Sequence, residues 1–145
     1  MALSKKKNNE SKNMHFSRED QKKILSSSSP FIVKEAYSSI RTNLLFSQKG
    51  DECPVFIVTS PTANIGKSIN SVNMAVSFAQ MGKKTLLIDA DMRNPTVHRL
   101  FSIPVKNGLS EILAGLTDNI TVSKTDIENL SVLTAGKIPP NPSEL

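Results

Sequence analysis

The sequence predicts an α/β domain built on a parallel sheet, and three kinds of pattern carry that prediction. Continuous apolar runs at 55–58 and 85–88 are typical of strands buried on both faces of a parallel sheet. Between them lies an amphipathic helical pattern that ends near Gly82. A third apolar run at 130–133 follows a short helical pattern at 110–113. Strand, helix, strand, helix, strand is the order of an α/β domain with a parallel sheet.

The remaining elements flank this pattern. Apolar residues recur at spacings of three and four from 34 to 46 and predict a helix that Gly50 ends. A short helical turn is expected between Pro95 and Phe101. The proline-rich stretch 138–145 is expected to be extended.

Length and composition favour one soluble domain. The chain has 145 residues, of which 38% are hydrophobic and 21% charged. No apolar run approaches the roughly 20 residues that cross a bilayer, and no apolar stretch follows the basic start, so neither a membrane span nor a signal peptide is expected. A cytoplasmic location follows. Cys53 is the single cysteine, which excludes an internal disulfide and favours a small packing role.

The positive charge is concentrated near the start of the chain. The net charge is +5, and residues 1–23 contribute +4 of it. Because 1–29 are polar and serine-rich, they are expected to form a disordered basic tail before a folded unit at 30–145. Such a tail is either simply solvated or attracted to an anionic membrane surface. No nucleic-acid partner is expected, since no aromatic residues alternate with basic ones on a folded face.

The sequence Gly66-Lys67-Ser68 lies between a predicted strand and a predicted helix, which is the context of a phosphate-binding loop. Backbone N–H groups and the helix N-terminus would hold phosphates, Lys67 would add an ammonium, and Ser68 would offer a hydroxyl to magnesium. The general motif has glycine where Pro61 stands, and Asn64 tolerates positive φ in its place. The alternative is an ordinary turn into a helix. Nucleotide contacts are expected from Asn64, Ile65, Gly66, Lys67, Ser68 and Ile69.

Two carboxylates follow the second predicted strand directly. Asp89 stands where it can hold magnesium opposite the phosphate loop, directly or through water. Asp91, two residues on, can accept a proton from an attacking hydroxyl. The alternative is that Asp89 caps the next turn and Asp91 is solvated. Both carboxylates lie in the same strand–helix–strand unit as the phosphate loop, which favours a shared site.

Four motifs follow one another in unbroken order: Thr59–Ser68, Leu86–Arg93 with Asn94-Pro95, Asn107–Ser110, and Leu133–Gly136 followed by Pro139–Leu145. Together they resemble the motifs of the bacterial tyrosine kinases of capsule and exopolysaccharide synthesis. The resemblance covers about residues 31 to 145 and implies a P-loop NTPase-like three-layer fold, incomplete at the C-terminus. It also implies transfer of the γ-phosphoryl of ATP to protein tyrosines.

The resemblance assigns roles by position. Lys67 would hold the phosphates, Ser68 and Asp89 would bind Mg²⁺, and Asp91 would be the base for the tyrosine hydroxyl, with Asp91 and Lys67 as the catalytic pair. Members of the Gram-positive type are cytoplasmic and are activated by the cytoplasmic tail of a membrane protein of the polysaccharide chain-length type, which implies recruitment to the inner face of the membrane.

The same resemblance extends to assembly. The family's ring-forming motif is a Glu followed at three-residue steps by two Arg. Glu35 and Arg41 match it, while Ser38 takes the middle place. A homo-oligomer formed through this helix is therefore an expectation that two of the three motif positions support.

The family continues past residue 145 with a helix, a second acidic strand, further sheet and a tyrosine-rich tail. Because the acidic strand would lie beside 55–58, that run is expected to have an unpaired edge. Tyr37 is the single tyrosine and is expected to be a core or interface residue. The resulting hypothesis is that this chain by itself has weak kinase activity or none.

Two other functions stay open. One is a P-loop ATPase switch of the partition or septum-positioning type, which usually carries an early loop lysine that 60–65 lack. The other is a non-catalytic fragment that binds the activator.

Overall fold

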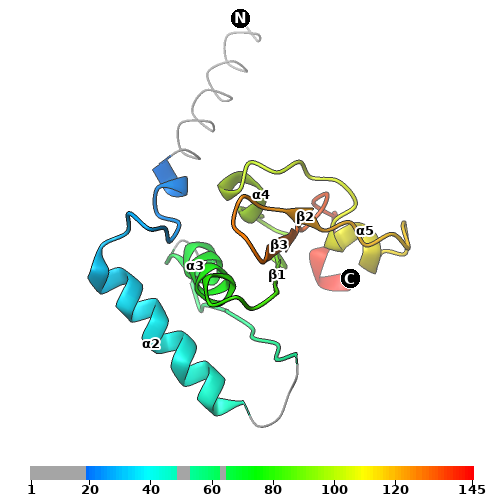
Figure 1. Ribbon diagram of the computed structural model, residues 1–145. Coiled ribbons are helices and arrows are strands. Elements are labelled where there is room, and N and C mark those ends of the chain that lie inside the picture. Colours follow the sequence, from blue (N-terminus) through cyan, green and yellow to red (C-terminus); the bar gives the residue numbers. More distant parts are fainter. Residues whose placement is uncertain (1–18, 49–52, 63–64) are drawn as a thin grey trace, which may run out of the picture.

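The computed structural model describes residues 19–48, 53–62 and 65–145. This part of the chain contains both helices and strands, with helices before and after the first strand (Figure 1). The elements are α2 Phe31–Ser47, α3 Lys67–Gln80, β1 Thr85–Ile88, α4 Val97–Leu100, α5 Leu109–Leu113, β2 Ser123–Lys124, β3 Leu130–Leu133 and the 3₁₀ turn η1 Pro142–Glu144.

The sheet has the strand order β1-β3-β2. β1 and β3 are parallel, with Thr85 opposite Leu130 and Ile88 opposite Leu133, which confirms two predicted strands and their direction. The two-residue strand β2 pairs antiparallel with β3 and was not expected from the sequence. A strand this short has too few residues to show an apolar alternation.

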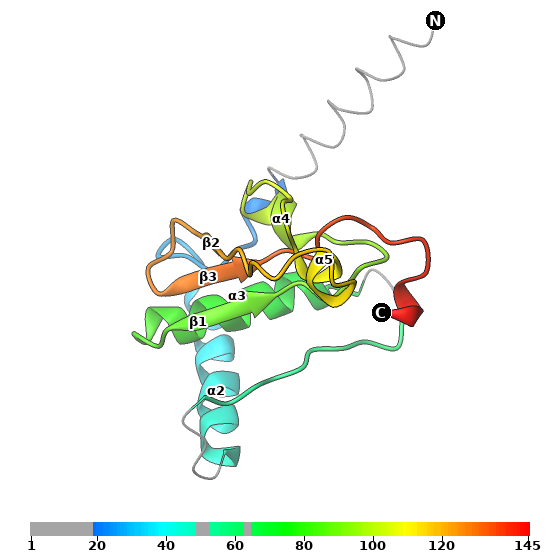
Figure 2. The ribbon, with the colours of Figure 1, turned by 90° about the vertical axis from the view of Figure 1, so that its right-hand side faces the viewer.

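The core forms where α3 crosses the sheet, and α2 lies on the outer side of α3 (Figures 1 and 2). α3 presents Val72 and Val76 to Leu130 and Val132, and all four side chains are fully or almost fully buried. α4 completes this core with Val97 and Leu100. α2 has no fully buried residue, so it is attached to α3 along one side only.

The predicted strand at 55–58 is wrong for this structure. The segment has no strand pairing, and the side chains of Val55 and Ile57 are 82% and 88% exposed. Its main apolar anchor is Phe56, whose ring stacks on Phe78 of α3 at a centroid distance of 5.6 Å. A strand needs a neighbour for its backbone hydrogen bonds, and among the described residues β1 pairs with β3 alone. In place of the expected strand with an unpaired edge, the segment runs apart from the sheet (Figure 2).

The prediction of disorder over 1–29 is wrong for residues 19–29, whereas 1–18 lie outside the described residues. Leu25 is 4% exposed and belongs to the core. Its backbone N–H donates to Asn73 Oδ1 at 2.8 Å, and Asn73 Nδ2 donates to the Lys23 carbonyl at 3.0 Å. The folded unit therefore includes this segment, because one leucine and one buried asparagine hold a polar stretch in place.

Only one face of β1 is covered within the described residues. Leu87 packs toward the core, whereas Leu86 and Ile88 on the other face are 49% and 47% exposed. Of the three layers expected, this part of the chain supplies the sheet and the helices on one side. The described helices include none that combines the length and the apolar character needed to cross a membrane.

Candidate nucleotide site

The predicted phosphate loop ends at the start of α3. Gly66 is the residue before the helix and has φ = +87°, a left-handed conformation that favours glycine. A Cβ on Gly66 would also lie 3.4 Å from Asn70 Nδ2. The first N–H groups of a helix have no intrahelical acceptor, so those of Lys67, Ser68 and Ile69 are the donors that this end offers to an anion.

Lys67 and Asp91, the two residues expected to be catalytic, lie side by side in the structure. Lys67 Nζ lies 2.9 Å from Asp91 Oδ2, and both side chains are partly buried. Asp91 Oδ1 accepts the N–H of Asn94 at 3.0 Å. Burial by itself raises the pKa of Asp91, but the Lys67 ammonium and the Asn94 N–H outweigh it and hold that pKa below its usual value. Asp91 is thus an ionised carboxylate at neutral pH.

Asp89 is buried, with 5% of its surface exposed, and it organises the loop after β1. Its Oδ1 accepts the N–H of Asp91 at 3.1 Å, and its Oδ2 accepts those of Thr96 and Val97, each at 3.1 Å. The capping alternative is therefore present in the structure. A carboxylate has about four acceptor positions, so these three N–H groups fill most of those that Asp89 has.

The other predicted contacts are arranged around the same helix end. Ser68 and Ile69 lie in the first turn of α3 and are half-buried, whereas Ile65 is 56% exposed. Asn64 lies outside the described residues. No group of three acidic, histidine or cysteine side chains within the described ranges could hold a metal ion alone. A magnesium ion here would therefore need oxygen ligands from phosphates and water in addition to Ser68.

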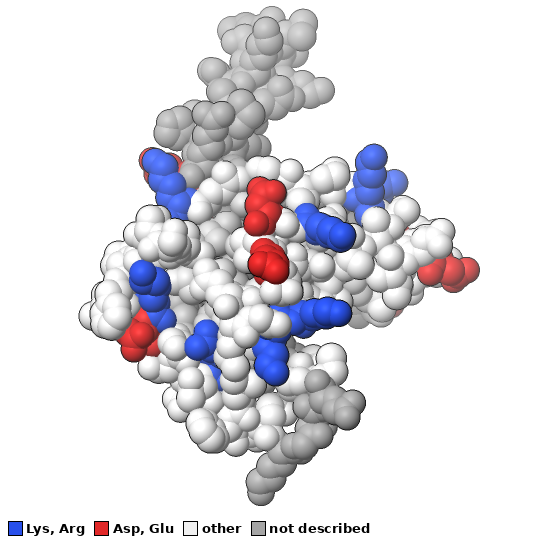
Figure 3. Space-filling view, in the orientation of Figure 1, with Lys and Arg blue, Asp and Glu red and all other residues white. Residues whose placement is uncertain are grey.

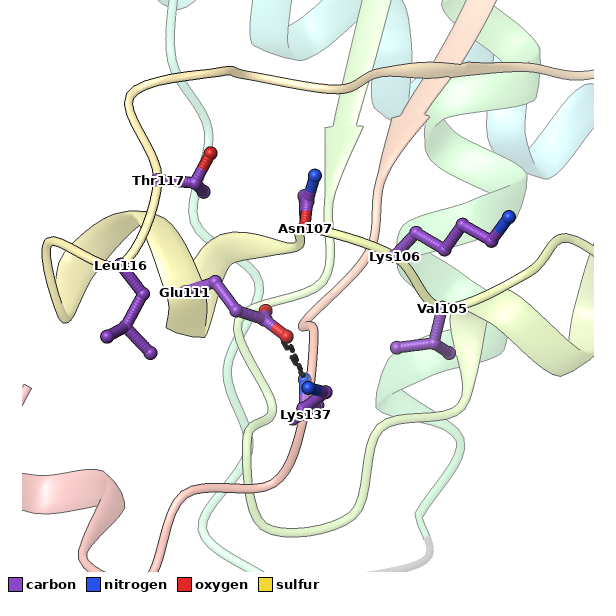
Figure 4. A pocket seen from close by; sticks show the side chains of 7 residues that line it. All are labelled: Val105, Lys106, Asn107, Glu111, Leu116, Thr117 and Lys137. Atoms are coloured by element: carbon purple, nitrogen blue, oxygen red, sulfur yellow. Dashed lines mark hydrogen bonds between the residues drawn. The ribbon is translucent and has the colours of Figure 1, made fainter.

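The hollow drawn in Figure 4 lies elsewhere, beside α5, and it contains none of the predicted site residues. Its volume is about 380 Å³. Glu111 lines it and accepts the N–H of Lys137 at 3.2 Å (Figure 4). Glu111 also accepts the N–H of Gly108 at 3.0 Å and the Ser110 hydroxyl at 3.0 Å. Burial raises the pKa of Glu111, but these donors lower it by more. Glu111 is a buried clamp between α5 and the segment after β3.

Sequence reasoning missed this clamp, although a signal was present. Glu111 is the third residue of α5 and bonds back to the N–H before the helix, which is half of the capping-box pattern. The close approach that it stabilises requires glycine, because a Cβ on Gly108 would lie 2.2 Å from the Gly136 nitrogen.

Charges of both signs are spread over the face in Figure 3, and the described residues on that face form no continuous basic patch. The Arg93 guanidinium, on the loop after β1, donates to Ser143 Oγ of η1 at 3.0 Å. Arg41 of the expected oligomer helix donates instead within its own chain, to the Ser77 carbonyl at 2.8 Å, whereas Glu35 is exposed.

Comparison with known proteins identifies the family of the chain. The family model described as an AAA domain matches residues 58–138, more than half of the chain. The tyrosine-protein kinase YwqD of Bacillus subtilis strain 168 is 40% identical over 127 residues, which cover 86% of this chain and 54% of that protein. The tyrosine-protein kinase CpsD of Streptococcus pneumoniae is 43% identical over 115 residues, covering 78% and 50%.

A solved structure extends the likeness to the fold. The tyrosine kinase domain of BceF superposes with a TM-score of 0.73 at 41% identity, covering 83% of this chain and 49% of that one. The P-loop α/β fold class predicted from the sequence is thereby confirmed. The chain spans about half the length of the relatives that it matches.

Proposed function

The chain belongs to the AAA domain family and is homologous to bacterial tyrosine kinases, and from that premise we propose that it is the ATP-binding part of a protein-tyrosine kinase of capsule or exopolysaccharide synthesis. One observation carries the proposal. Lys67, at the free N-terminus of α3, meets Asp91, at the carboxyl end of β1. A kinase site needs a cation for the phosphates and a base for the acceptor hydroxyl close together, and in α/β folds such sites lie at the carboxyl ends of the strands.

In the proposed site the N–H groups after Gly66 and the ammonium of Lys67 hold the phosphates of ATP. Ser68 would hold the Mg²⁺ ion through its hydroxyl, and Asp89 would hold it through water, since Asp89 already accepts three backbone N–H groups. Bound magnesium would neutralise charge on the phosphoryl group as it is transferred. Asn64, Ile65 and Ile69 complete the loop around the nucleotide.

Asp91 accepts the proton of the tyrosine hydroxyl in this proposal. Its depressed pKa keeps it ionised, and its ion pair with Lys67 holds it in place before nucleotide binds. When Lys67 turns to the phosphates, Asp91 loses its nearest cation and becomes a stronger base. The two residues thus exchange partners, which couples nucleotide binding to activation of the base.

The proposed partners are a protein tyrosine substrate and the cytoplasmic tail of a membrane activator of the polysaccharide chain-length type. The protein would then be cytoplasmic and recruited to the inner face of the membrane. Homo-oligomer formation through Glu35 and Arg41 remains part of the proposal, with the condition that Arg41 exchanges its bond to Ser77 for one to a neighbouring copy.

Phosphate transfer tests the proposal. The purified chain is incubated with Mg²⁺, γ-labelled ATP and a glutamate–tyrosine copolymer, and labelled tyrosine and free phosphate are both measured. We expect label on tyrosine above the level of Lys67→Ala and Asp91→Asn, at a rate below that of the longer relatives. Release of phosphate to water without labelled tyrosine would identify an ATPase switch. The absence of both products would overturn the transfer step and leave the activator-binding alternative.

A further inference from the structure

A hydroxyl on α2 reaches the phosphate loop through one intermediate side chain. Tyr37 OH donates to Asn70 Oδ1 at 2.7 Å, and Asn70 Nδ2 donates to the carbonyl oxygen of Gly66 at 3.0 Å. Tyr37 lies in α2 and Asn70 in the first turn of α3, so the contact joins two helices at the end where nucleotide is expected.

These bonds form a relay from Tyr37 through Asn70 to Gly66, and the relay starts one residue earlier, at the buried Asn73. Asn73 is 4% exposed, and its Nδ2 donates to Tyr37 OH at 3.3 Å. Donors and acceptors therefore run in one direction, from Asn73 to Tyr37, then to Asn70 and to Gly66. Hydrogen bonds aligned in this way polarise one another, which favours this arrangement over a chain of isolated contacts.

The Gly66 carbonyl, where the relay ends, fixes the orientation of the Lys67 N–H, one of the donors of the proposed nucleotide site. A peptide unit is planar, so the carbonyl of Gly66 and the N–H of Lys67 share one rigid plane. Asn70 holds that carbonyl twice, through its side chain and through its backbone N–H at 3.0 Å. Gly66 is flexible by itself and takes φ = +87° here. Fixing its carbonyl therefore fixes the direction of the Lys67 N–H.

We propose that Tyr37 is a positioning residue of the nucleotide site, acting through Asn70 to orient the Gly66–Lys67 peptide toward the phosphates of ATP. This inference rests on the proposed function. The ring of Tyr37 packs against the core, so only its hydroxyl serves the relay. Tyr37→Phe therefore removes the positioning group and keeps the apolar packing.

The first test compares Mg-ATP binding by isothermal titration calorimetry among wild type, Tyr37→Phe and Ser39→Ala, which removes an exposed hydroxyl from the same helix. Losing one hydrogen bond weakens binding of Tyr37→Phe about five- to tenfold, and Ser39→Ala binds as wild type does. The double variant Tyr37→Phe/Asn70→Ala binds Mg-ATP as weakly as Asn70→Ala alone, because both residues act through the same hydrogen bonds. Equal dissociation constants for wild type and Tyr37→Phe would overturn the proposal.

A second readout needs no nucleotide. The amide proton of Lys67 is followed by NMR in the free protein, where Tyr37→Phe shifts its resonance and speeds its exchange, while amides at 75–79 stay unchanged. If wild type fails to bind Mg-ATP, the proposed function fails, and the Lys67 amide still decides the relay. An unchanged Lys67 amide in Tyr37→Phe would overturn the positioning role in either case.

Discussion

At the scale of single residues, the ion pair between Lys67 and Asp91 is the contact most directly tied to the proposed chemistry. Asp91→Asn frees the ammonium while keeping the side-chain shape. We expect Mg-ATP to bind Asp91→Asn at least as tightly as wild type, with tyrosine phosphorylation lost by about 100-fold or more. Titration calorimetry and the phosphate-transfer assay measure the two effects. Weaker nucleotide binding by Asp91→Asn would show that the carboxylate aids binding instead.

Glu111 supplies a pH-dependent contribution to stability. Its lowered folded-state pKa means that the ionised carboxylate stabilises the fold above the pKa of the unfolded side chain, and that this stabilisation is lost as pH falls through the folded pKa. Glu111→Gln should therefore lower the free energy of unfolding by about 1.5–3 kcal/mol near neutral pH. The deficit should shrink below about pH 4.

Urea unfolding at neutral and acidic pH measures this difference. Glu128→Gln, an exposed carboxylate, is the matched control and should change little at either pH. A deficit in Glu111→Gln that stays constant with pH would mean that packing, and not charge, holds α5 to the segment after β3.

At the scale of elements, α4 depends on a residue from outside itself. Asp89 accepts two N–H groups at the start of α4 and one in the loop before it. Asp89→Asn should lower the free energy of unfolding by about 1–3 kcal/mol in buffer with chelator and no nucleotide. Asp126→Asn, on the surface, is the control. Unchanged stability of Asp89→Asn would leave a metal role as the main reason for the carboxylate.

Elements that local pattern specifies were predicted well, and those that need a distant neighbour were not. β1 and β3 were predicted from their apolar runs, and both form because they pair with each other and contribute Leu87, Leu130 and Val132 to the core. The run at 55–58 has the same pattern but lacks a pairing strand among the described residues. Periodicity identifies a segment able to form a strand, while pairing decides whether it does.

Two site features show the same limit. The sequence placed Lys67 and Asp91 in one predicted site, and the structure has their side chains in contact, although of the two strands predicted before them only the one before Asp91 forms. Tyr37 packs against the core as expected, but its hydroxyl bond from α2 to α3 could not be predicted. Nor could the bond of Leu25 to a buried asparagine 48 positions away. Spacing along one element contains no information about such contacts.

For the whole molecule, exposed apolar surface is the main liability. Ile57 is 88% exposed, and Leu86 and Ile88 leave one face of an edge strand uncovered. We expect the purified chain to self-associate at micromolar concentrations and to bind a hydrophobic dye. Ile57→Lys should reduce the association without lowering the melting temperature, because its side chain contributes little to the core.

Sedimentation velocity measures the association, with Asn119→Lys as the control that adds the same charge at an exposed polar position. A wild-type chain that is monomeric at high concentration would contradict this expectation. If Ile57→Lys and Asn119→Lys reduce self-association equally, the added charge and not the loss of apolar surface is the cause.

The central claim is that this chain binds Mg-ATP at the N-terminus of α3, and equilibrium titration of the purified protein with Mg-ATP tests it most directly. The account predicts saturable binding of one nucleotide per chain in wild type and in Lys84→Ala, an exposed lysine outside the site. Lys67→Ala should bind at least about tenfold more weakly, since it loses a charge-assisted contact to phosphate. Absence of binding in wild type, or equal binding by Lys67→Ala, would contradict the claim.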